Sequence, residues 1–499
     1  FTVKLAVYHY QLVTYPFAAE YREGVIPSNT ALLVNGENPF SVDHQPSYTN
    51  LYGLGYPLMV WPLAKVFGPT IILHRIVTGF FILLCCLFLF VIMRRMKVPF
   101  HLNACATIFF YASLLYPGTI TACANPSPLG LFLFALSIFI PWMKNYSVGS
   151  LIVSILLGLA AFYTKLYFVF GIFLVGSYLF FFVSKKKGLL YTLLFLVFWI
   201  PGIFIVDYFF NSYFNNCFFI HDNDAVGHSS FIFLTRQLKA YAHIHGPILV
   251  LCAFVFLSQC KRILNALQTI IKGVRLNFFR LEAPLFTLPV HLVLYCGFWC
   301  LLLLVFSLGK GHAAWLWYFF HLLSPFFLIG TFWILSRHSW WPVLFTPFLI
   351  YNLFTFTALH DYKKLDKNDP QWILASELVK TYNDILNGPP VAGLLIDQGK
   401  HVYDNGLSEY FKMGAFRWNP RTAKFFKPNG QIMVRYYVYL NTIRNKIKNK
   451  EFDLAMITQE QDGQLVPGEL QEYYNYVGTV KLKCPHAGGD FPVTIWRPK

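Results

Sequence analysis

Residues 69–93 read PTIILHRIVTGFFILLCCLFLFVIM and are followed directly by the basic cluster Arg94-Arg95-Met96-Lys97. An α-helix needs about 20 apolar residues to cross a bilayer, and this run meets that length. A cluster of Lys and Arg at one end of such a run is typical of its cytoplasmic side. The stretch therefore predicts a membrane-spanning helix whose C-terminal end faces the cytoplasm.

Similar apolar runs recur as far as residue 358. The 499-residue chain is 56% hydrophobic and 13% charged, whereas soluble domains carry about 25% charged residues. Together with a first helix over about 1–17, the runs predict a polytopic α-helical membrane protein with about eleven spans. The other runs lie near 101–117, 127–143, 148–164, 167–184, 189–207, 246–260, 285–307, 313–335 and 340–358. Because the chain begins with Phe1, we expect a segment before it and a partial first span.

The formal charge of +17 could indicate nucleic-acid binding. The basic residues, however, follow every second apolar run, which is the positive-inside pattern of cytoplasmic loops and excludes that function class. Alternation then places 18–68, 118–126, 208–245, 308–312 and everything after 358 on the outer side. We expect an integral protein of the bacterial inner (plasma) membrane.

The composition changes near residue 359. From there to Lys499 the chain carries 19 basic and 15 acidic residues and has no apolar run long enough to span a membrane. We predict a soluble extracytoplasmic α/β domain over 359–499, large enough for its own core, next to a transmembrane domain over 1–358. Strands are predicted at 391–396, 453–457 and 476–482, and a helix at 371–386. Residues 53–68 predict a helix lying on the outer membrane surface.

Acidic residues are scarce before residue 360, and half of them lie in the first outer loop. The eight are Glu20, Glu23, Glu37, Asp43, Asp207, Asp222, Asp224 and Glu282. A membrane protein that concentrates its few carboxylates in one loop is expected to use at least one of them for chemistry.

Several motifs follow one another along the chain. They are Glu23-Gly24, NGENPFSV, TNLYGLGYPL, ACANPSPLG at 122–130, Phe162-Tyr163-Thr164-Lys165, 215–224, WLWYFFHLLSP at 315–325 and the closing VTIWRP at 493–498. Taken in this order, the motifs resemble those of the GT-C fold glycosyltransferases, and most of all the bacterial lipid-linked-sugar transferases grouped with protein mannosyltransferases and aminoarabinose transferase. Asn125-Pro126-Ser127 departs from the Arg-Pro-Asp that the family often has there.

The resemblance implies transfer of a sugar from a polyprenyl-phosphate carrier, with inversion, on the outer side of the membrane. Such a reaction needs a carboxylate that accepts the proton of the attacking hydroxyl and cations that neutralise the departing phosphate. It implies no cofactor besides the lipid-linked donor. The acceptor is left open as a glycan, a lipid or a protein, and membrane lipids are the other expected partners.

Glu23 is the first candidate for the base, because it matches the acid of the family's Glu-Gly motif. Asp43 is the second candidate and could instead bind acceptor hydroxyls. Glu20 lies three residues before Glu23, so on a helix the two would share a face and raise each other's pKa. Glu37 follows Gly36 in an expected turn and reads as a solvated charge.

Cations near the outer ends of spans are candidates for binding the donor phosphate, because an ammonium or guanidinium is costly in the membrane without a partner. The alternative for Lys165 is snorkelling to lipid headgroups, and for Arg75 it is helix packing against a carbonyl. For Lys310 and His312 the alternative is an interfacial belt. Aromatic residues of the same loops are candidates for holding acceptor or sugar. The phosphate candidates are Lys165, Arg75, Lys310 and His312; the aromatic candidates are Tyr48, Tyr52, Trp315 and Tyr318.

Two further features stay open. His221, Asp222, Asp224 and His228 have the spacing of a metal-binding loop, but solvated loop residues fit as well, and we predict no metal. Cys217 and Cys484 both fall on the outer side and could pair.

The alternatives to an enzyme are a membrane transporter and a non-catalytic scaffold whose outer domain binds a partner. A transporter would show inverted repeats and acids at mid-membrane.

Overall fold

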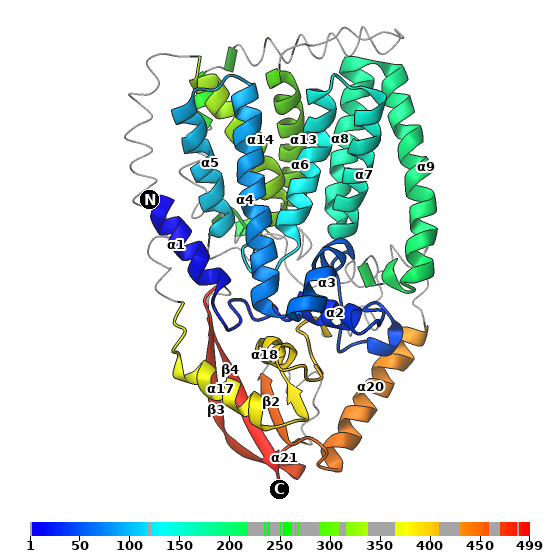
Figure 1. Cartoon of the computed structure of the whole chain (residues 1–499), viewed down its shortest axis with the longest axis vertical. Coiled ribbons are helices and arrows are strands. Elements are labelled where there is room, and N and C mark those ends of the chain that lie inside the picture. Colours follow the sequence, from blue (N-terminus) through cyan, green and yellow to red (C-terminus); the bar gives the residue numbers. More distant parts are fainter. Residues whose placement is uncertain are drawn as a thin grey trace.

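The computed structural model describes residues 2–116, 121–214, 289–308, 316–337, 365–408, 430–458, 470–486 and 489–499, with short pieces between 216 and 268. A bundle of roughly aligned helices forms one part of the molecule, and a small sheet with its own helices forms the other (Figure 1). The helices of the first loop, α2 and α3, lie between these two parts (Figure 1).

The bundle follows the apolar runs closely. Its helices are α1 (Thr2–Val13), α4 (Ile71–Arg95), α5 (Phe100–Leu115), α6 (Ser127–Met143), α7 (Val148–Thr164), η2 with α8 and η3 (Leu166–Val183), α9 (Lys185–Phe209), α13 (Pro289–Ser307) and α14 (Leu316–Leu335). Three stretches, Ile71–Arg95, Leu166–Val183 and Lys185–Phe209, are long and apolar enough to cross a membrane. The run near 246–260 is described only in part, and 340–358 lies outside the described residues.

Helix boundaries have local causes. Thr70 caps α4 by accepting a hydrogen bond from Leu73 N–H, and Ser184 caps α9 in the same way through Lys187 N–H, as short hydroxyl side chains do at helix starts. The α4 helix ends at Arg94 and Arg95, basic residues that suit a helix C-terminus. Helix α9 packs with only one side against the bundle and exposes large apolar residues such as Leu193, Ile200 and Phe204, as expected of a lipid-facing helix.

The first loop contains more structure than its sequence suggested. Helix α2 (Val25–Val34) is almost completely buried, and the 3₁₀ turn η1 (Val42–His44) follows it. Helix α3 (Gly55–Phe67) forms where a surface helix was predicted over 53–68. Its exposed residues are mostly apolar and include Met59, Val66 and Phe67.

The C-terminal domain is built on a four-stranded sheet in the order β1-β2-β4-β3. Strand β1 (Ile385–Asn387) pairs in parallel with β2 (Leu454–Thr458). Strand β4 (Gly489–Pro498) pairs antiparallel with β2 and with β3 (Tyr474–Cys484). The helices are α17 (Pro370–Thr381), α18 (Ala392–Asp397), α20 (Gly430–Lys448) and α21 (Leu470–Tyr473).

Two expectations for this domain were wrong. Residues 391–396 form a 3₁₀ turn and α18 rather than a strand. Pro389 and Pro390 pre-set the first helical turn, and continuous burial of 391–396 removes the alternation a half-buried strand requires. The helix predicted to reach 386 ends at Thr381, because Asn383 and Asp384 donate their N–H groups to the Asp453 carboxylate and open strand β1. The strands predicted at 453–457 and 476–482 are confirmed within β2 and β3.

Helix α18 seats the domain on the membrane part. A Cβ atom added at Gly24 would lie 2.6 Å from the Cβ of Ala392. A Cβ atom added at Gly393 would lie 2.1 Å from the Ile71 side chain. Both positions therefore need glycine for close packing. Asn405 adds a second contact, because its side chain donates to the carbonyl of Thr49 at 2.9 Å. The C-terminal domain thus rests on the first loop and on the start of α4.

Candidate functional site

The first candidate residue, Glu23, forms a buried ion pair with Arg75. The Nε and Nη2 atoms of Arg75 each donate to one Glu23 oxygen at 2.6 Å, and both side chains are fully buried. This two-point geometry is the strong form of an Arg–carboxylate pair. Arg75 comes from the second turn of α4, whereas Glu23 comes from the loop that follows α1.

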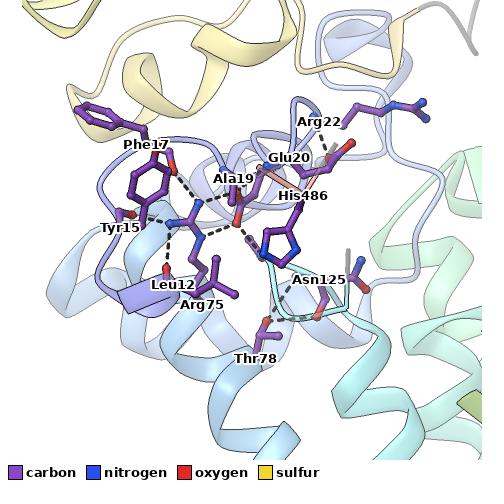
Figure 2. Close-up of polar contacts among 12 residues, drawn as sticks. Leu12, Tyr15, Phe17, Ala19, Glu20, Arg22, Arg75, Thr78, Asn125 and His486 are labelled. Atoms are coloured by element: carbon purple, nitrogen blue, oxygen red, sulfur yellow. Dashed lines mark hydrogen bonds and ion pairs between the residues drawn. The ribbon is translucent and has the colours of Figure 1, made fainter. Parts of the chain in front are cut away.

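Arg75 also gathers the end of α1 and the chain after it. Figure 2 shows its guanidinium surrounded by the carbonyls of Leu12, Tyr15 and Phe17, each of which accepts one of its N–H groups. With the two bonds to Glu23, all five guanidinium donors are used. The position predicted for phosphate binding therefore holds protein groups instead.

Glu23 is equally saturated. Besides Arg75, it accepts the backbone N–H groups of Ala19 and Ala124 at 2.8 Å and of Glu20 at 3.4 Å. The positive charge of Arg75 and these hydrogen bonds outweigh desolvation, so the pKa of Glu23 lies below its ordinary value. A carboxylate in this state is a weak proton acceptor.

A short segment, Ala124 to Ser127, joins Glu23 to Lys165. Ala124 N–H binds Glu23 at one end, and Ser127 Oγ accepts the Lys165 ammonium at 2.8 Å at the other. Between them, Asn125 exchanges backbone hydrogen bonds with the Thr78 hydroxyl of α4 (Figure 2). Three residues of chain span at most about 11 Å. The Glu23 carboxylate and the Lys165 ammonium, both predicted for the site, are therefore close together.

Lys165 sits where α7 ends, in aromatic surroundings. Its Nζ lies 4.7 Å from the centre of the Tyr52 ring and 6.0 Å from that of Tyr167. The Tyr52–Gly53 turn is held there because Gly53 N–H binds the Thr164 carbonyl. Lys165 and Tyr52, two of the candidates from the sequence, therefore lie close together, and Ser127 from the unusual Asn125-Pro126-Ser127 motif binds Lys165.

Glu20 differs from Glu23 in its surroundings. It is 9% exposed, and its carboxylate accepts the Arg22 N–H at 2.9 Å. Burial raises its pKa to about 7, with Glu23 adding to the rise and Arg22 opposing it. The mutual effect expected from their spacing is present for Glu20. A buried carboxyl with a pKa near neutrality is suited to general-base chemistry.

Glu20 lies against the β3–β4 hairpin of the C-terminal domain. The backbone N–H of His486, just beyond β3, donates to the Ala19 carbonyl, and its ring meets the Tyr8 hydroxyl at 2.6 Å. Figure 2 shows His486 of the C-terminal domain near Glu20, which belongs to the first loop.

Asp43 and Tyr48 lie toward the C-terminal domain. Asp43 is exposed on η1, and its carbonyl accepts a hydrogen bond from Arg435 of α20. The Tyr48 hydroxyl accepts the backbone N–H of Val402 at 3.2 Å and meets the His401 ring at 3.4 Å. Glu37 pairs with His44 at 3.1 Å on the loop surface, as its solvated interpretation suggested.

Other candidates fall outside the described residues, or their side chains do. These are Lys310, His312, Trp315, the Tyr318 side chain, and His221, Asp222, Asp224 and His228. Within the described ranges, no group of three His, Cys, Asp or Glu residues could hold a metal ion. Cys217 and Cys484 are each buried as free thiols and lie in separate hydrophobic clusters, so the pairing considered from the sequence is not formed.

The comparisons with known proteins concern the fold. No protein-family model and no curated protein matches the chain. Its structure is similar to crystal structures of ArnT from Cupriavidus metallidurans, one bound to undecaprenyl phosphate and one in the apo state. Each has a TM-score of 0.52 and 14% identity, and the match covers 99% of this chain and 96% of that chain. The chain has the GT-C fold of ArnT.

The ArnT-like fold accounts for both parts of the molecule, since the match includes the helical bundle and the C-terminal domain. The fold indicated by the order of the sequence motifs is thereby confirmed. Together with the long apolar helices, it identifies the chain as an integral membrane protein.

Proposed function

We propose that this protein transfers a sugar from a polyprenyl-phosphate carrier to an acceptor hydroxyl on the extracytoplasmic side of the membrane. One observation carries the proposal: the segment Ala124–Ser127 is hydrogen-bonded to the acidic first loop at one end and to the buried ammonium of Lys165 at the other. The ArnT-like fold supports it, since one of the similar structures binds undecaprenyl phosphate.

Lys165 is the donor-phosphate ligand in this proposal. The C–O bond between the anomeric carbon and the phosphate breaks during transfer, and the electron pair leaves with the phosphate oxygen. An ammonium in a buried setting stabilises that developing charge far more than it would in water. The aromatic rings of Tyr52 and Tyr167 keep the ammonium in place.

We assign the general base to Glu20 rather than to Glu23. Glu23 is occupied by Arg75 and three backbone N–H groups. Glu20 is buried, has a raised pKa and lies three residues before Glu23 in the same loop. The acceptor oxygen attacks the anomeric carbon from the side opposite the phosphate, its proton passes to Glu20, and the configuration inverts. Glu23 and Arg75 hold the loop in position for this step.

Asp43 remains a candidate for binding acceptor hydroxyls, because its exposed carboxylate lies on the same loop. Lys310, His312, Trp315 and Tyr318 remain candidates for phosphate and sugar contacts near the start of α14. The donor implies no separate cofactor.

The experiment uses the full chain in nanodiscs with polyprenyl phosphates carrying mannose, glucose, galactose or aminoarabinose, and a panel of hydroxyl acceptors including water. Release of polyprenyl phosphate is measured. We expect wild-type protein to consume at least one donor and Glu20→Gln to lose about 10² to 10⁴ of the rate, the usual contribution of a general base. Lys165→Gln should lose a comparable factor.

Lys65→Gln is the matched control, because Lys65 is exposed on α3 and its Nζ packs over the Trp61 ring. It should keep the wild-type rate. A folded wild-type protein that consumes none of the donors would reject the transferase and favour the transporter or scaffold.

A further inference from the structure

A cluster of buried, neutral polar side chains lies where the first loop meets the C-terminal domain. Its members are Ser28, Asn29, Gln45, Thr49, Asn50 and Asn405, and each is at least 99% buried. We call this set the amide cluster. Buried amides normally satisfy all their hydrogen-bonding groups within the protein or with ordered water.

Hydrogen bonds join four members of the amide cluster, and the other two, Asn29 and Asn50, are the chain neighbours of Ser28 and Thr49. Asn405 donates to the Thr49 carbonyl at 2.9 Å and to the Ser28 hydroxyl at 3.4 Å. The Thr49 hydroxyl donates to Gln45 Oε1 at 2.9 Å. Asn405 thereby connects α2 with the 45–50 turn, although these segments come from different parts of the loop.

Three atoms of the amide cluster make no hydrogen bond to any described residue. They are Asn29 Oδ1, Gln45 Nε2 and Asn50 Nδ2. Leaving a buried donor or acceptor without a partner costs about 1–3 kcal/mol. One acceptor and two donors in a single neutral cluster have the hydrogen-bonding character needed to bind the hydroxyl groups of an uncharged sugar.

We propose that the amide cluster binds the sugar of the lipid-linked donor and selects a neutral, hydroxyl-rich pyranose; the proposal rests on the transferase function above. The donor is favoured over the acceptor because Asn50 is tied to the phosphate end of the site. Asn50 Oδ1 accepts the Tyr52 N–H at 2.8 Å, and the Tyr52 ring faces the Lys165 ammonium. A sugar joined to a phosphate at Lys165 would lie within reach of the Asn50 turn.

The charge of the amide cluster indicates the class of sugar. A cationic aminosugar binds best to a carboxylate, whereas the six members are all neutral. The neighbouring Asp404 directs its carboxylate to its own turn, where it accepts Gly406 N–H at 2.8 Å. We therefore expect a neutral hexose donor to be preferred to an aminoarabinose donor by about tenfold.

The test measures binding rather than turnover. Calorimetry on the full-length protein in nanodiscs compares polyprenyl phosphate with polyprenyl phosphate carrying mannose, glucose or galactose. We expect the best hexose to improve wild-type affinity. Gln45→Met should remove about tenfold of that improvement and leave the affinity for bare polyprenyl phosphate unchanged.

Gln45→Met suits this purpose because it is close in shape and deletes the unpartnered Nε2. The Thr49 hydroxyl also has the Pro46 carbonyl at 2.8 Å and keeps a partner. The thermal unfolding temperature of the Gln45→Met protein should equal or exceed that of wild type. If the Gln45 amide had a purely structural role, the substitution would lower this temperature. Gln398→Met, an exposed glutamine at the end of α18, is the matched control and should change neither value.

Asn50→Asp provides the second test. The substitution keeps the Oδ1 acceptor for Tyr52 N–H and replaces the amide donor with a negatively charged oxygen. The binding preference should therefore shift toward the carrier of the cationic aminoarabinose. The proposal is overturned if Gln45→Met binds the hexose carriers as wild type does. If the same variant binds normally but transfers sugar more slowly, the amides would bind acceptor hydroxyls, and the proposal is also overturned. Wild-type preference for the aminoarabinose carrier would also overturn it. Failure of wild type to bind any polyprenyl phosphate would instead reject the transferase itself.

Discussion

Two acids three residues apart in one loop have opposite electrostatic surroundings. Glu23 faces a guanidinium and backbone N–H groups, and its pKa falls. Glu20 is buried with fewer compensating contacts, and its pKa rises to about 7. Separated pKa values of this kind are how neighbouring carboxylates take different roles. At the residue scale, the loop therefore has one structural acid and one candidate base.

Glu23→Gln tests the structural role. The substitution leaves Arg75 buried without its counter-charge, and breaking such a pair costs about 3–5 kcal/mol. We expect a clear fall in thermal unfolding temperature of the purified protein. Glu377→Gln is the control, since its pair with Lys380 is exposed and contributes little. Equal unfolding temperatures for Glu23→Gln and wild type would contradict the role.

The pH dependence tests the candidate base. Glu20 must be ionised to accept a proton, so kcat/KM should rise with pH and level off above about 7, and this limb should vanish in Glu20→Gln. A rate that is flat between pH 5 and 8 in wild type would contradict the assignment.

Stability should show the opposite trend with pH. The pKa of about 7 in the folded protein lies above the ordinary glutamate value of 4.5, so the folded protein binds more protons than the unfolded chain between these values. The contribution of Glu20 to stability is therefore lost as pH rises from about 4.5 to 7. Unfolding temperatures measured across this window should fall less steeply in Glu20→Gln than in wild type.

At the scale of elements, α18 is the part of the C-terminal domain that packs against the first loop. It is short, and it reaches both Gly24 beside Glu23 and Ile71 at the start of α4. The same helix carries Asp397, which accepts the Ile71 N–H and whose pKa is raised by burial to about 6. The domain thus contacts the two elements that supply the Glu23–Arg75 pair.

Gly393→Val tests this packing. A Cβ atom there would meet the Ile71 side chain at 2.1 Å, so α18 or α4 must shift, at a typical cost of 1–3 kcal/mol. We expect reduced donor consumption together with a lower unfolding temperature. Gly149→Ala in α7 is the control, since its Cβ meets nothing within 4 Å and should leave both values unchanged.

At the scale of the whole molecule, the bundle and the sheet domain form a continuous body through the first loop (Figure 1). The amide cluster and the surroundings of Glu20 both include groups from the two parts. Orientation in the membrane then decides on which side transfer takes place.

Cysteine labelling in intact cells tests that orientation. With the exposed Cys260 replaced by Ser, Asn445→Cys on α20 should react with a membrane-impermeant maleimide. Lys186→Cys, in the basic first turn of α9, should react only after permeabilisation. The reverse pattern would place the C-terminal domain in the cytoplasm.

The sequence by itself determined the helical bundle and the C-terminal part with its sheet, and it singled out the first loop and Lys165 as candidates. These follow from length, apolar periodicity and the position of charges, which are local properties of the chain. Strand β4 and helix α20 were not predicted, and 391–396 was assigned wrongly, because short buried segments have no clear period.

Only the tertiary structure decided which of the two acids has a carboxylate that is not already saturated with hydrogen bonds. Glu20 and Glu23 are nearly equivalent in sequence, and their difference comes from Arg75, 52 residues away, and from Ala124, 101 residues away. The amide cluster likewise depends on Asn405, 356 residues from Thr49. The free energy of a buried charge or amide depends on the partners that surround it in space, and these contacts exist only after the chain has folded.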